Sequence, residues 1–277
     1  MTSYFRLDGA RVLVTGASRG IGRAVALAFA EAGADVAITA RSIEALKDTA
    51  ERVQETGRRV FPIAGDLSDP ETAGRFATEA AQALGGLDIL VHNAGVLPTD
   101  DAGNSRLAPF AEGDASDWDP VLEVNLGGTV ALCRAVYPYL AESGRANIVI
   151  MSSVAGLIAS PAMEAYAVTK AGQISLARSL SAAWARQGIR VNALCPGWVR
   201  TDMTAPMRDQ APLADWLLSH VPLGRWLDPE EVAASAVYLA SPAAAAVTGQ
   251  ALVVDGGLSV PDGGLAGIPK PPSPFAD

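Results

Sequence analysis

Short runs of β-branched and apolar residues alternate with longer Ala- and Leu-rich segments along most of the 277-residue chain. Runs at 11–14, 35–39, 59–63, 88–91, 147–151, 189–194 and 251–254 are expected as strands, and segments near 21–32, 43–56, 70–84, 120–142, 164–186 and 229–240 as helices. Strand cores such as NIVIM and ALVV are apolar on both faces, which is typical of a parallel sheet covered on both sides. The pattern therefore predicts one doubly wound α/β domain, a seven-stranded parallel sheet with helices on both faces.

Three stretches interrupt this rhythm. Residues 96–117 form a long polar segment, and residues 198–228 are rich in Trp, Met and Pro, as expected of a lid over a binding site. Residues 258–277 are a Pro- and Gly-rich tail for which we expect no regular structure. We see no linker or repeat inside residues 1–257 and expect them to form a single domain.

Composition excludes several classes of protein. The net charge is −9 and the pI about 4.8, so we expect no nucleic-acid partner, because such proteins present a basic face to phosphates. The two His and two Cys residues are too few and scattered for a metal cage, and none is expected. No secretory signal and no apolar run of about 18 residues is visible, so we expect a cytoplasmic protein without a membrane segment.

A glycine-rich loop follows the first predicted strand directly and leads into a helix. Glycines let the backbone turn sharply and approach a pyrophosphate, and the helix N-terminus adds free N–H groups and a positive dipole. The alternative is a tight turn before a helix, but the position at the start of a βαβ unit favours a dinucleotide site. The residues expected to bind the cofactor here are Gly16, Ser18, Arg19, Gly20, Ile21 and Gly22.

The second strand ends without the acidic residue that binds the ribose 2′-OH of NAD. Arg41 follows it instead, and Arg41 and Arg19 together are able to bind a 2′-phosphate through charge-assisted hydrogen bonds. The sequence therefore favours NADP(H) over NAD(H), unless these are two surface arginines pointing into solvent.

Tyr166 and Lys170 are four residues apart and share one face of a predicted helix. A neighbouring ammonium favours the phenolate and lowers the pKa of a phenol from about 10, which suits proton exchange with a carbonyl oxygen. Ser153, at the end of the preceding strand, is placed to hydrogen-bond the same oxygen. The chain contains only three lysines (Lys47, Lys170 and Lys270) against 18 arginines, so a lysine at position 170 needs a reason.

These motifs together resemble the short-chain dehydrogenase/reductase family. The loop TGASRGIG, the triplet Asn93-Ala94-Gly95, Asn125, Ser153 and the Tyr166/Lys170 pair occur in the family's order, and Pro196-Gly197 and Asp255-Gly256-Gly257 also match. The likeness covers about residues 8–257 and implies a Rossmann-type catalytic domain. His92 departs from the pattern, since the family usually has Asn there; we expect a hydrogen-bonded core residue.

The resemblance implies a role for each matching position. Tyr166 would be the catalytic acid/base, Lys170 would lower its pKa and hold the nicotinamide ribose, and Ser153 would orient the substrate carbonyl. Asn125 would distort its helix and hold a water in a proton relay. The further cofactor contacts implied are Asp66 and Leu67 at adenine, Asn93, Ala94 and Gly95 beside the cofactor, and Pro196, Gly197, Val199 and Thr201 at the nicotinamide.

Apolar residues near the predicted strand ends suggest the substrate. Leu97, Leu157, Met163, Trp198, Met203 and Met207 are expected to line the pocket, with Val96, Ile158, Trp216 and Leu217 as further candidates. Such a pocket favours a hydrophobic or aromatic ketone, or its secondary alcohol. The alternative is that many of these residues simply pack the lid.

The sequence thus predicts an NADPH-dependent carbonyl reductase that also runs as an alcohol dehydrogenase. An NAD-dependent secondary-alcohol dehydrogenase, a 3-oxoacyl reductase and a non-catalytic nucleotide-sensing regulator are the alternatives. Surplus apolar residues on the helices at 120–142 and 164–186 favour a homo-oligomer, a tetramer or dimer.

Overall fold

The computed structural model describes residues 3–99 and 110–261, together with 267, 270 and 272. Its seven strands are β1 (Arg11–Thr15), β2 (Asp35–Ala40), β3 (Val60–Ala64), β4 (Ile89–His92), β5 (Asn147–Met151), β6 (Arg190–Pro196) and β7 (Ala251–Val254). They form one parallel sheet in the order β3-β2-β1-β4-β5-β6-β7. The order reverses between β1 and β4, and open α/β sheets bind ligands outside the strand ends at such a point.

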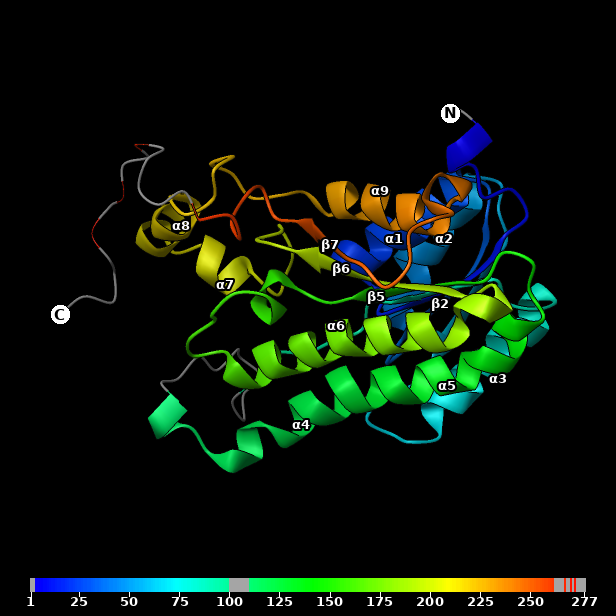
Figure 1. The fold of residues 1–277 in the computed structure, drawn as a ribbon, viewed down its shortest axis with the longest axis horizontal. Coiled ribbons are helices and arrows are strands. Elements are labelled where there is room, and N and C mark those ends of the chain that lie inside the picture. The colour runs from blue at the N-terminus through cyan, green and yellow to red at the C-terminus, as the bar shows by residue number, and fades with distance from the viewer. Residues whose placement is uncertain (1–2, 100–109, 262–266, 268–269, 271, 273–277) are drawn as a thin grey trace.

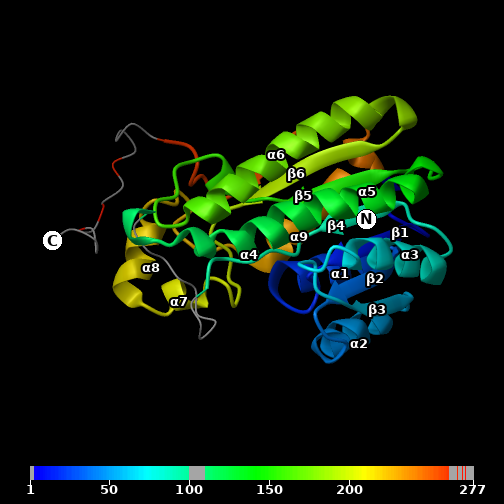
Figure 2. The same cartoon turned by 90° about the horizontal axis from the view of Figure 1, so that it is seen from below.

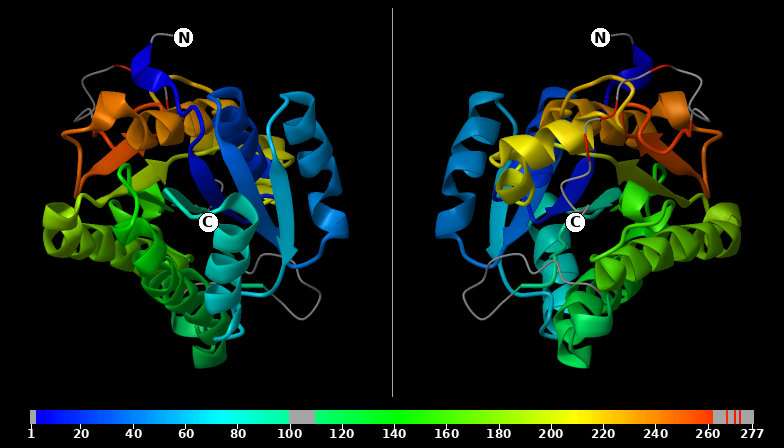
Figure 3. Two further views of the ribbon diagram at one scale, coloured as in Figure 1. Left: turned by 90° about the vertical axis from the view of Figure 1, so that its right-hand side faces the viewer. Right: turned by 90° about the vertical axis from the view of Figure 1, so that its left-hand side faces the viewer.

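Helices cover both faces of this sheet. Their bounds are α1 (Gly20–Glu31), α2 (Lys47–Glu55), α3 (Thr72–Leu84), α4 (Asp119–Val121), α5 (Gly128–Ala141), α6 (Glu164–Trp184), α7 (Ala205–Arg208), α8 (Ala211–Leu218) and α9 (Pro229–Ala240). Figures 1 and 3 show α1, α2 and α9 on one face and α3, α5 and α6 on the other. The predicted fold class, a doubly wound seven-stranded α/β sheet, is confirmed.

The core is two apolar layers that share the sheet. Alternate strand residues point to opposite faces, so Val12 and Val14 pack under α1 and α9, while Leu13 packs under α3 and α5. None of the helices in the described part of the chain has both the length and the apolar character needed to cross a membrane.

Two segments differ from the sequence-based expectations. The helix expected at 120–142 is broken: α4 leads into a π-helix at Leu122–Gly127 before α5 begins. Residues 198–228, expected as an irregular lid, contain α7 and α8, which lie together at one end of the molecule (Figure 2). Proline stands in the first turn of both, where its missing N–H costs nothing. The expectations for 100–109 and for most of the tail lie outside the described residues.

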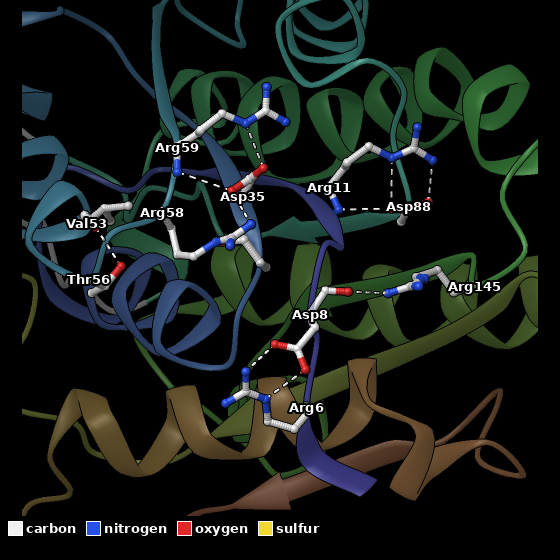
Figure 4. A network of polar contacts seen from close by, with 11 residues as sticks. Arg6, Asp8, Arg11, Asp35, Val53, Thr56, Arg58, Arg59, Asp88 and Arg145 are labelled. Carbon is white, nitrogen blue, oxygen red and sulfur yellow. Dashed lines mark hydrogen bonds and ion pairs between the residues drawn. The ribbon is translucent and has the colours of Figure 1, made fainter. Parts of the chain in front are cut away.

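Buried carboxylates tie the strands together where they begin (Figure 4). Asp88 precedes β4 and accepts hydrogen bonds from the guanidinium and the backbone N–H of Arg11 and from Ser143. Burial by itself would raise the pKa of Asp88, but these hydrogen bonds outweigh it and hold the pKa below its ordinary value. Asp35, the first residue of β2, is paired in the same way with Arg58 and Arg59. These pairs lie at the end of the sheet where the strands begin, opposite the loops described next.

Candidate active site

The loop after β1 brings backbone very close to backbone. Gly16 has a positive φ of 65°, and a Cβ there would lie 2.9 Å from the Cα of Ala94. A Cβ at Gly22 would lie 2.1 Å from the carbonyl oxygen of Gly16. No side chain larger than hydrogen fits at either position, so the loop is folded tightly against the end of β4.

Helix α1 begins at Gly20 without a side-chain cap. Its N-cap residue, Arg19, is extended and makes no side-chain hydrogen bond to the first turn. Because N–H groups at a helix N-terminus lack intrahelical partners, this end of α1 presents donors and positive dipole toward the loop. The geometry suits a pyrophosphate.

The two arginines expected at a 2′-phosphate are both exposed. Arg19 forms an ion pair with Asp202 at 3.1 Å, and both side chains are 66% exposed. Arg41 follows β2 directly and is exposed. The structure leaves both guanidinium groups accessible at this end of the sheet.

Thr15 and Asn93 lock β1 to β4 under the glycine loop. The Thr15 hydroxyl accepts hydrogen bonds from the backbone N–H groups of Asn93 and Ala94, at 3.0 and 3.1 Å. The Asn93 amide donates to the carbonyl oxygens of Thr15 and Gly16. Asn93 therefore braces the loop, and Ala94 and Gly95 follow it at the same edge.

His92 is fully buried at the end of β4. Its Nδ1 lies 3.0 Å from the Thr15 hydroxyl, which confirms the prediction of a hydrogen-bonded core residue. Burial, followed by the charge of Lys170, lowers the pKa of His92 to about 3, so its imidazole is neutral. Its Nε2 has no hydrogen-bond partner among the described residues.

Lys170 is buried on α6, and its ammonium donates to the carbonyl oxygen of Met151 at 2.8 Å. The same nitrogen lies 5.3 Å from the centre of the Tyr166 ring. Burial lowers the pKa of Lys170 from 10.5 to about 7. The helical spacing thus brings the two residues together as the sequence predicts.

Tyr166 and Ser153 meet beside this lysine. Burial raises the pKa of Tyr166 to about 12, and a hydrogen bond with Ser153 acts in the opposite direction. The pKa of Tyr166 is therefore raised in the chain by itself, where the sequence predicts a lowering by Lys170, and Ser153 is the group that acts to lower it. Ser153 also caps a short helical turn by accepting from the backbone N–H of Ala155, which fixes its orientation.

Asn125 lies in the π-helix between α4 and α5, which is the distortion that the resemblance implied. Its side chain is fully buried and exchanges two hydrogen bonds with the backbone of Val96, at 2.8 and 2.9 Å. It also donates to the Thr169 hydroxyl on α6. Asn125 therefore ties the loop after β4 to the helix that carries Tyr166.

The main-chain carbonyl oxygen of Asn125 is itself hydrogen-bonded by two side chains, and the water expected at Asn125 stays a prediction. It accepts one hydrogen bond from the Gln173 amide at 2.8 Å and another from the Thr129 hydroxyl. A carbonyl oxygen has two lone pairs, and both are used. Gln173 was missed by the sequence reasoning, although its position three residues after Lys170 places it on the same helix face.

The segment after β6, which the resemblance places at the nicotinamide, packs beside the glycine loop. Gly197 packs against Asp255 so closely that a Cβ would lie 2.8 Å from its Cα. Val199 is buried and pairs with Leu227 in an isolated parallel bridge. Thr201 packs against Gly20 at the start of α1. Pro196 to Thr201 thus runs past the glycine loop at the base of the lid.

The expected pocket residues fall into two groups. Leu157 and Met203 are exposed, and Met163 and Trp198 are partly exposed. Leu97 and Met207 are buried, and Met207 packs with Trp226 in the apolar cluster of the lid. A small cleft beside Met163 has a lining that sequence reasoning missed: Pro98, Phe110, Gly113, Asp114, Asp117, Trp118, Ala162, Glu164 and Ala165.

Asp66 and Leu67 follow β3 at the same end of the sheet. The Asp66 carboxylate accepts hydrogen bonds from the backbone and the hydroxyl of Ser68. Leu67 packs against the apolar layer that contains Leu13, under α3 and α5. The glycine loop, the open N-terminus of α1 and the adjoining strand ends lie at this end of the sheet. The chemistry of these residues fits a nicotinamide dinucleotide.

Known proteins share this arrangement along almost the whole chain. A family model described as enoyl-(acyl carrier protein) reductase matches residues 16–259. Gluconate 5-dehydrogenase of Gluconobacter oxydans is 34% identical over 92% of this chain and 97% of its own. The structure of a short-chain type dehydrogenase/reductase from Mycobacterium marinum aligns with a TM-score of 0.86 at 32% identity, covering 94% of this chain and 99% of that one. A gluconate 5-dehydrogenase from Burkholderia cenocepacia in complex with NADP and tartrate also aligns with a TM-score of 0.86, at 36% identity over 94% and 98%.

Proposed function

The chain belongs to the short-chain dehydrogenase/reductase family of oxidoreductases, and from that premise we propose that it transfers hydride between NADP(H) and a ketone or secondary alcohol. The observation that carries the proposal is the joint placement of Ser153, Tyr166 and Lys170 at the end of β5 and on α6. A binder that only senses nucleotides has no use for this set of groups, so the regulator alternative is less well supported.

The chain's residues act on the proton and on the carbonyl. Ser153, held by Ala155, would hydrogen-bond the substrate oxygen and orient it. Tyr166 would give a proton to that oxygen in reduction and remove it in oxidation. Lys170 keeps positive charge beside the phenol below about pH 7, and the N–H that no described residue uses would be available to a ribose hydroxyl. The nicotinamide would supply or accept the hydride and, when oxidised, would add positive charge that favours the phenolate.

The preference for NADP(H) rests on charge at the end of β2. Arg41 stands where an NAD-binding site would have an acid, and Arg41 and Arg19 are both exposed at the cofactor end of the sheet. A guanidinium group attracts a 2′-phosphate and a carboxylate repels it. The bound NADP in the Burkholderia cenocepacia relative is consistent with this preference.

For the substrate, we propose a hydrophobic or aromatic ketone or its secondary alcohol. Leu157, which follows β5, and Met203, in the lid, both expose apolar surface. Trp198 contacts Trp226 edge-on at 5.7 Å between ring centres. Exposed apolar side chains beside a reacting centre bind apolar substrate surface well. A polyol or sugar acid is the second candidate, since gluconate 5-dehydrogenase relatives match over the full domain.

We further propose a cytoplasmic homo-oligomer, a dimer or tetramer, assembled through α5 and α6. Leu132, Val136 and Ile174 are buried in the core, whereas Val130, Leu176, Leu180 and Trp184 remain partly exposed. This surplus of apolar surface is typical of a subunit interface.

The decisive experiment measures NADPH and NADH consumption with aromatic ketones, aliphatic ketones and keto-sugar acids in parallel. We expect turnover with NADPH and an aromatic ketone at a kcat/KM at least about tenfold above that with NADH. Faster turnover with NADH would contradict the cofactor proposal. Turnover confined to sugar acids would replace the substrate class but leave the reaction class intact.

A further inference from the structure

Gln173 is a buried polar residue for which the reaction as proposed has no role. It lies on α6, is fully buried, and is three residues from Lys170 and seven from Tyr166, so all three share one helix face. A buried amide is costly unless it is hydrogen-bonded, which makes its partners informative.

The Gln173 amide bridges two groups of the active site. Its Oε1 accepts from the ammonium of Lys170 at 3.1 Å. Its Nε2 donates to the main-chain oxygen of Asn125 at 2.8 Å and lies 2.9 Å from the Thr129 hydroxyl. An ammonium only donates and a carbonyl oxygen only accepts, so the chemistry of these partners fixes which way the amide points.

Lys170 has three N–H donors, and two of them are used by the residues that the structure describes. One goes to Met151 and one to Gln173, and both bonds are made in a buried environment where an acceptor stabilises the charged ammonium. The third has no hydrogen-bond partner within the described part of the chain, and the nitrogen that carries it lies 5.3 Å from the centre of the Tyr166 ring. Loss of one acceptor would leave the ammonium both less well oriented and less stable.

We propose that Gln173 is a positioning residue of the active site, which holds the ammonium of Lys170 charged and fixed beside Tyr166 and anchors it to the π-helix through the carbonyl oxygen of Asn125. The inference deepens the proposed function and depends on it for its catalytic meaning. Gln173 touches neither the substrate nor the cofactor and acts through Lys170.

The titratable neighbours of Lys170 do not obscure a change in its pKa. The titratable groups that face it are Tyr166 on its own helix, His92 at the end of β4 and Cys195 in β6. Burial lowers the pKa of His92 to about 3 and raises the pKa of Cys195 to about 11. Neither group changes its charge between about pH 5 and 9, so a shift in that range belongs to Lys170 or Tyr166.

The test uses the scarcity of lysine in this chain. With only three lysines, protein labelled with ¹³C at lysine Cε gives three NMR signals to follow against pH without cofactor, and the signal missing from a Lys170→Arg variant is that of Lys170. In Gln173→Met the pKa of Lys170 should fall by about one unit, the size expected for one lost charge-assisted hydrogen bond. Exposed Lys47 and Lys270 serve as internal references.

Thr129→Val is the matched control. It removes the other side-chain donor to the Asn125 oxygen but leaves Gln173 on Lys170, so the Lys170 titration should stay at the wild-type pH. Gln173→Glu keeps an acceptor for the ammonium and should return the pKa of Lys170 to the wild-type value or above. An equal shift in Thr129→Val and Gln173→Met, or no shift in Gln173→Met, would overturn the proposal. If Gln173→Met does not fold, a pKa of Lys170 in Gln173→Glu below the wild-type value would do so.

A kinetic measurement separates this proposal from the proposed function. In alcohol oxidation, the pH at which kcat/KM reaches half its plateau should move upward in Gln173→Met, because a less stable ammonium makes the phenolate of Tyr166 harder to form. Wild-type protein without any NADP(H)-dependent turnover would end the proposed function, while the NMR titration would still decide whether Gln173 controls Lys170. Normal turnover with an unmoved pH profile would overturn the role of Gln173 alone.

Discussion

The ammonium nitrogen of Lys170 donates a 2.8 Å hydrogen bond to the carbonyl oxygen of Met151, the last residue of β5. This bond joins the helix that carries Tyr166 to the strand that leads into Ser153. The distance between acid/base and orienting hydroxyl is therefore set by a contact between helix and sheet and does not depend on the mobility of a loop.

Removal of the phenol should abolish the chemistry and spare binding. We expect Tyr166→Phe to lower kcat by about 10³-fold, within the range for loss of a general acid/base, while the affinity for NADPH, measured by fluorescence titration, changes little. Tyr139→Phe is the control, since that hydroxyl contacts only Thr78 at 3.3 Å on the surface among the described residues. Oxidoreductase activity retained in Tyr166→Phe would mean that another group moves the proton.

The buried ammonium of Lys170 should lower the free energy of unfolding of the protein. Its pKa is about 7 in the folded protein against 10.5 ordinarily, so below pH 7 folding carries the full penalty of a buried charge. The penalty shrinks between about pH 7 and 10.5, where the unfolded chain still binds the proton that the folded protein has lost. Lys170→Met should therefore raise the free energy of unfolding by about 1–3 kcal/mol at pH 6 while it removes activity.

Urea denaturation of wild type and Lys170→Met at pH 6, 8 and 10 measures this difference. It should be largest at pH 6 and smallest at pH 10. A variant less stable than wild type at pH 6 would show that the two hydrogen bonds of Lys170 outweigh its burial.

Reversal of charge after β2 should change the cofactor. Arg41→Asp is expected to lower kcat/KM for NADPH by about 10- to 100-fold through loss of a charge-assisted bond and repulsion of the 2′-phosphate, and to improve NADH. Arg186→Asp makes the same charge change on an exposed residue at the opposite end of the sheet and should leave the NADPH/NADH ratio unchanged. Equal effects of the two variants would point to net charge alone.

The glycine loop should tolerate no side chain. In Gly22→Ala the new Cβ would meet the Gly16 oxygen at 2.1 Å, so we expect a loss of about 3 kcal/mol in stability or of cofactor binding. Gly74→Ala is the matched control: it lies inside α3 with open space around it and should stabilise the protein by about 0.5–1 kcal/mol. Thermal unfolding measured with and without NADPH distinguishes a loss of stability from a loss of cofactor binding.

Asp88 should make the free energy of unfolding depend on pH in the acid range. Because its pKa is held below 3.8, its contribution is present above about pH 4 and is lost as the pH falls through the folded-state pKa. Asp88→Asn should cost about 2–3 kcal/mol at pH 7, since Arg11 stays partly solvated. The difference from wild type should shrink at low pH, as the Asp88 carboxyl becomes protonated in the folded protein. Asp8→Asn, which alters an exposed pair with Arg6, should change little at either pH.

The sequence by itself determined the sheet, the glycine loop and the Tyr166/Lys170 pair, because each depends on local spacing: period two in strands, period 3.6 in helices, and glycine where two backbones nearly touch. The strands at 147–151 and 251–254 and the helix at 229–240 were predicted to the residue, since turn residues bound them closely.

Only the tertiary structure decided what surrounds those residues. The extent of the π-helix around Asn125, the helices of the lid and the burial of Met207 depend on contacts between segments far apart in sequence. The same is true of Gln173, which looks like an ordinary polar helix residue until packing places Lys170 on one side of its amide and Asn125 on the other. Burial then sets the pKa of Lys170 and Tyr166, because the cost of a charge depends on the protein and solvent around it, and the spacing along the chain does not encode that surrounding.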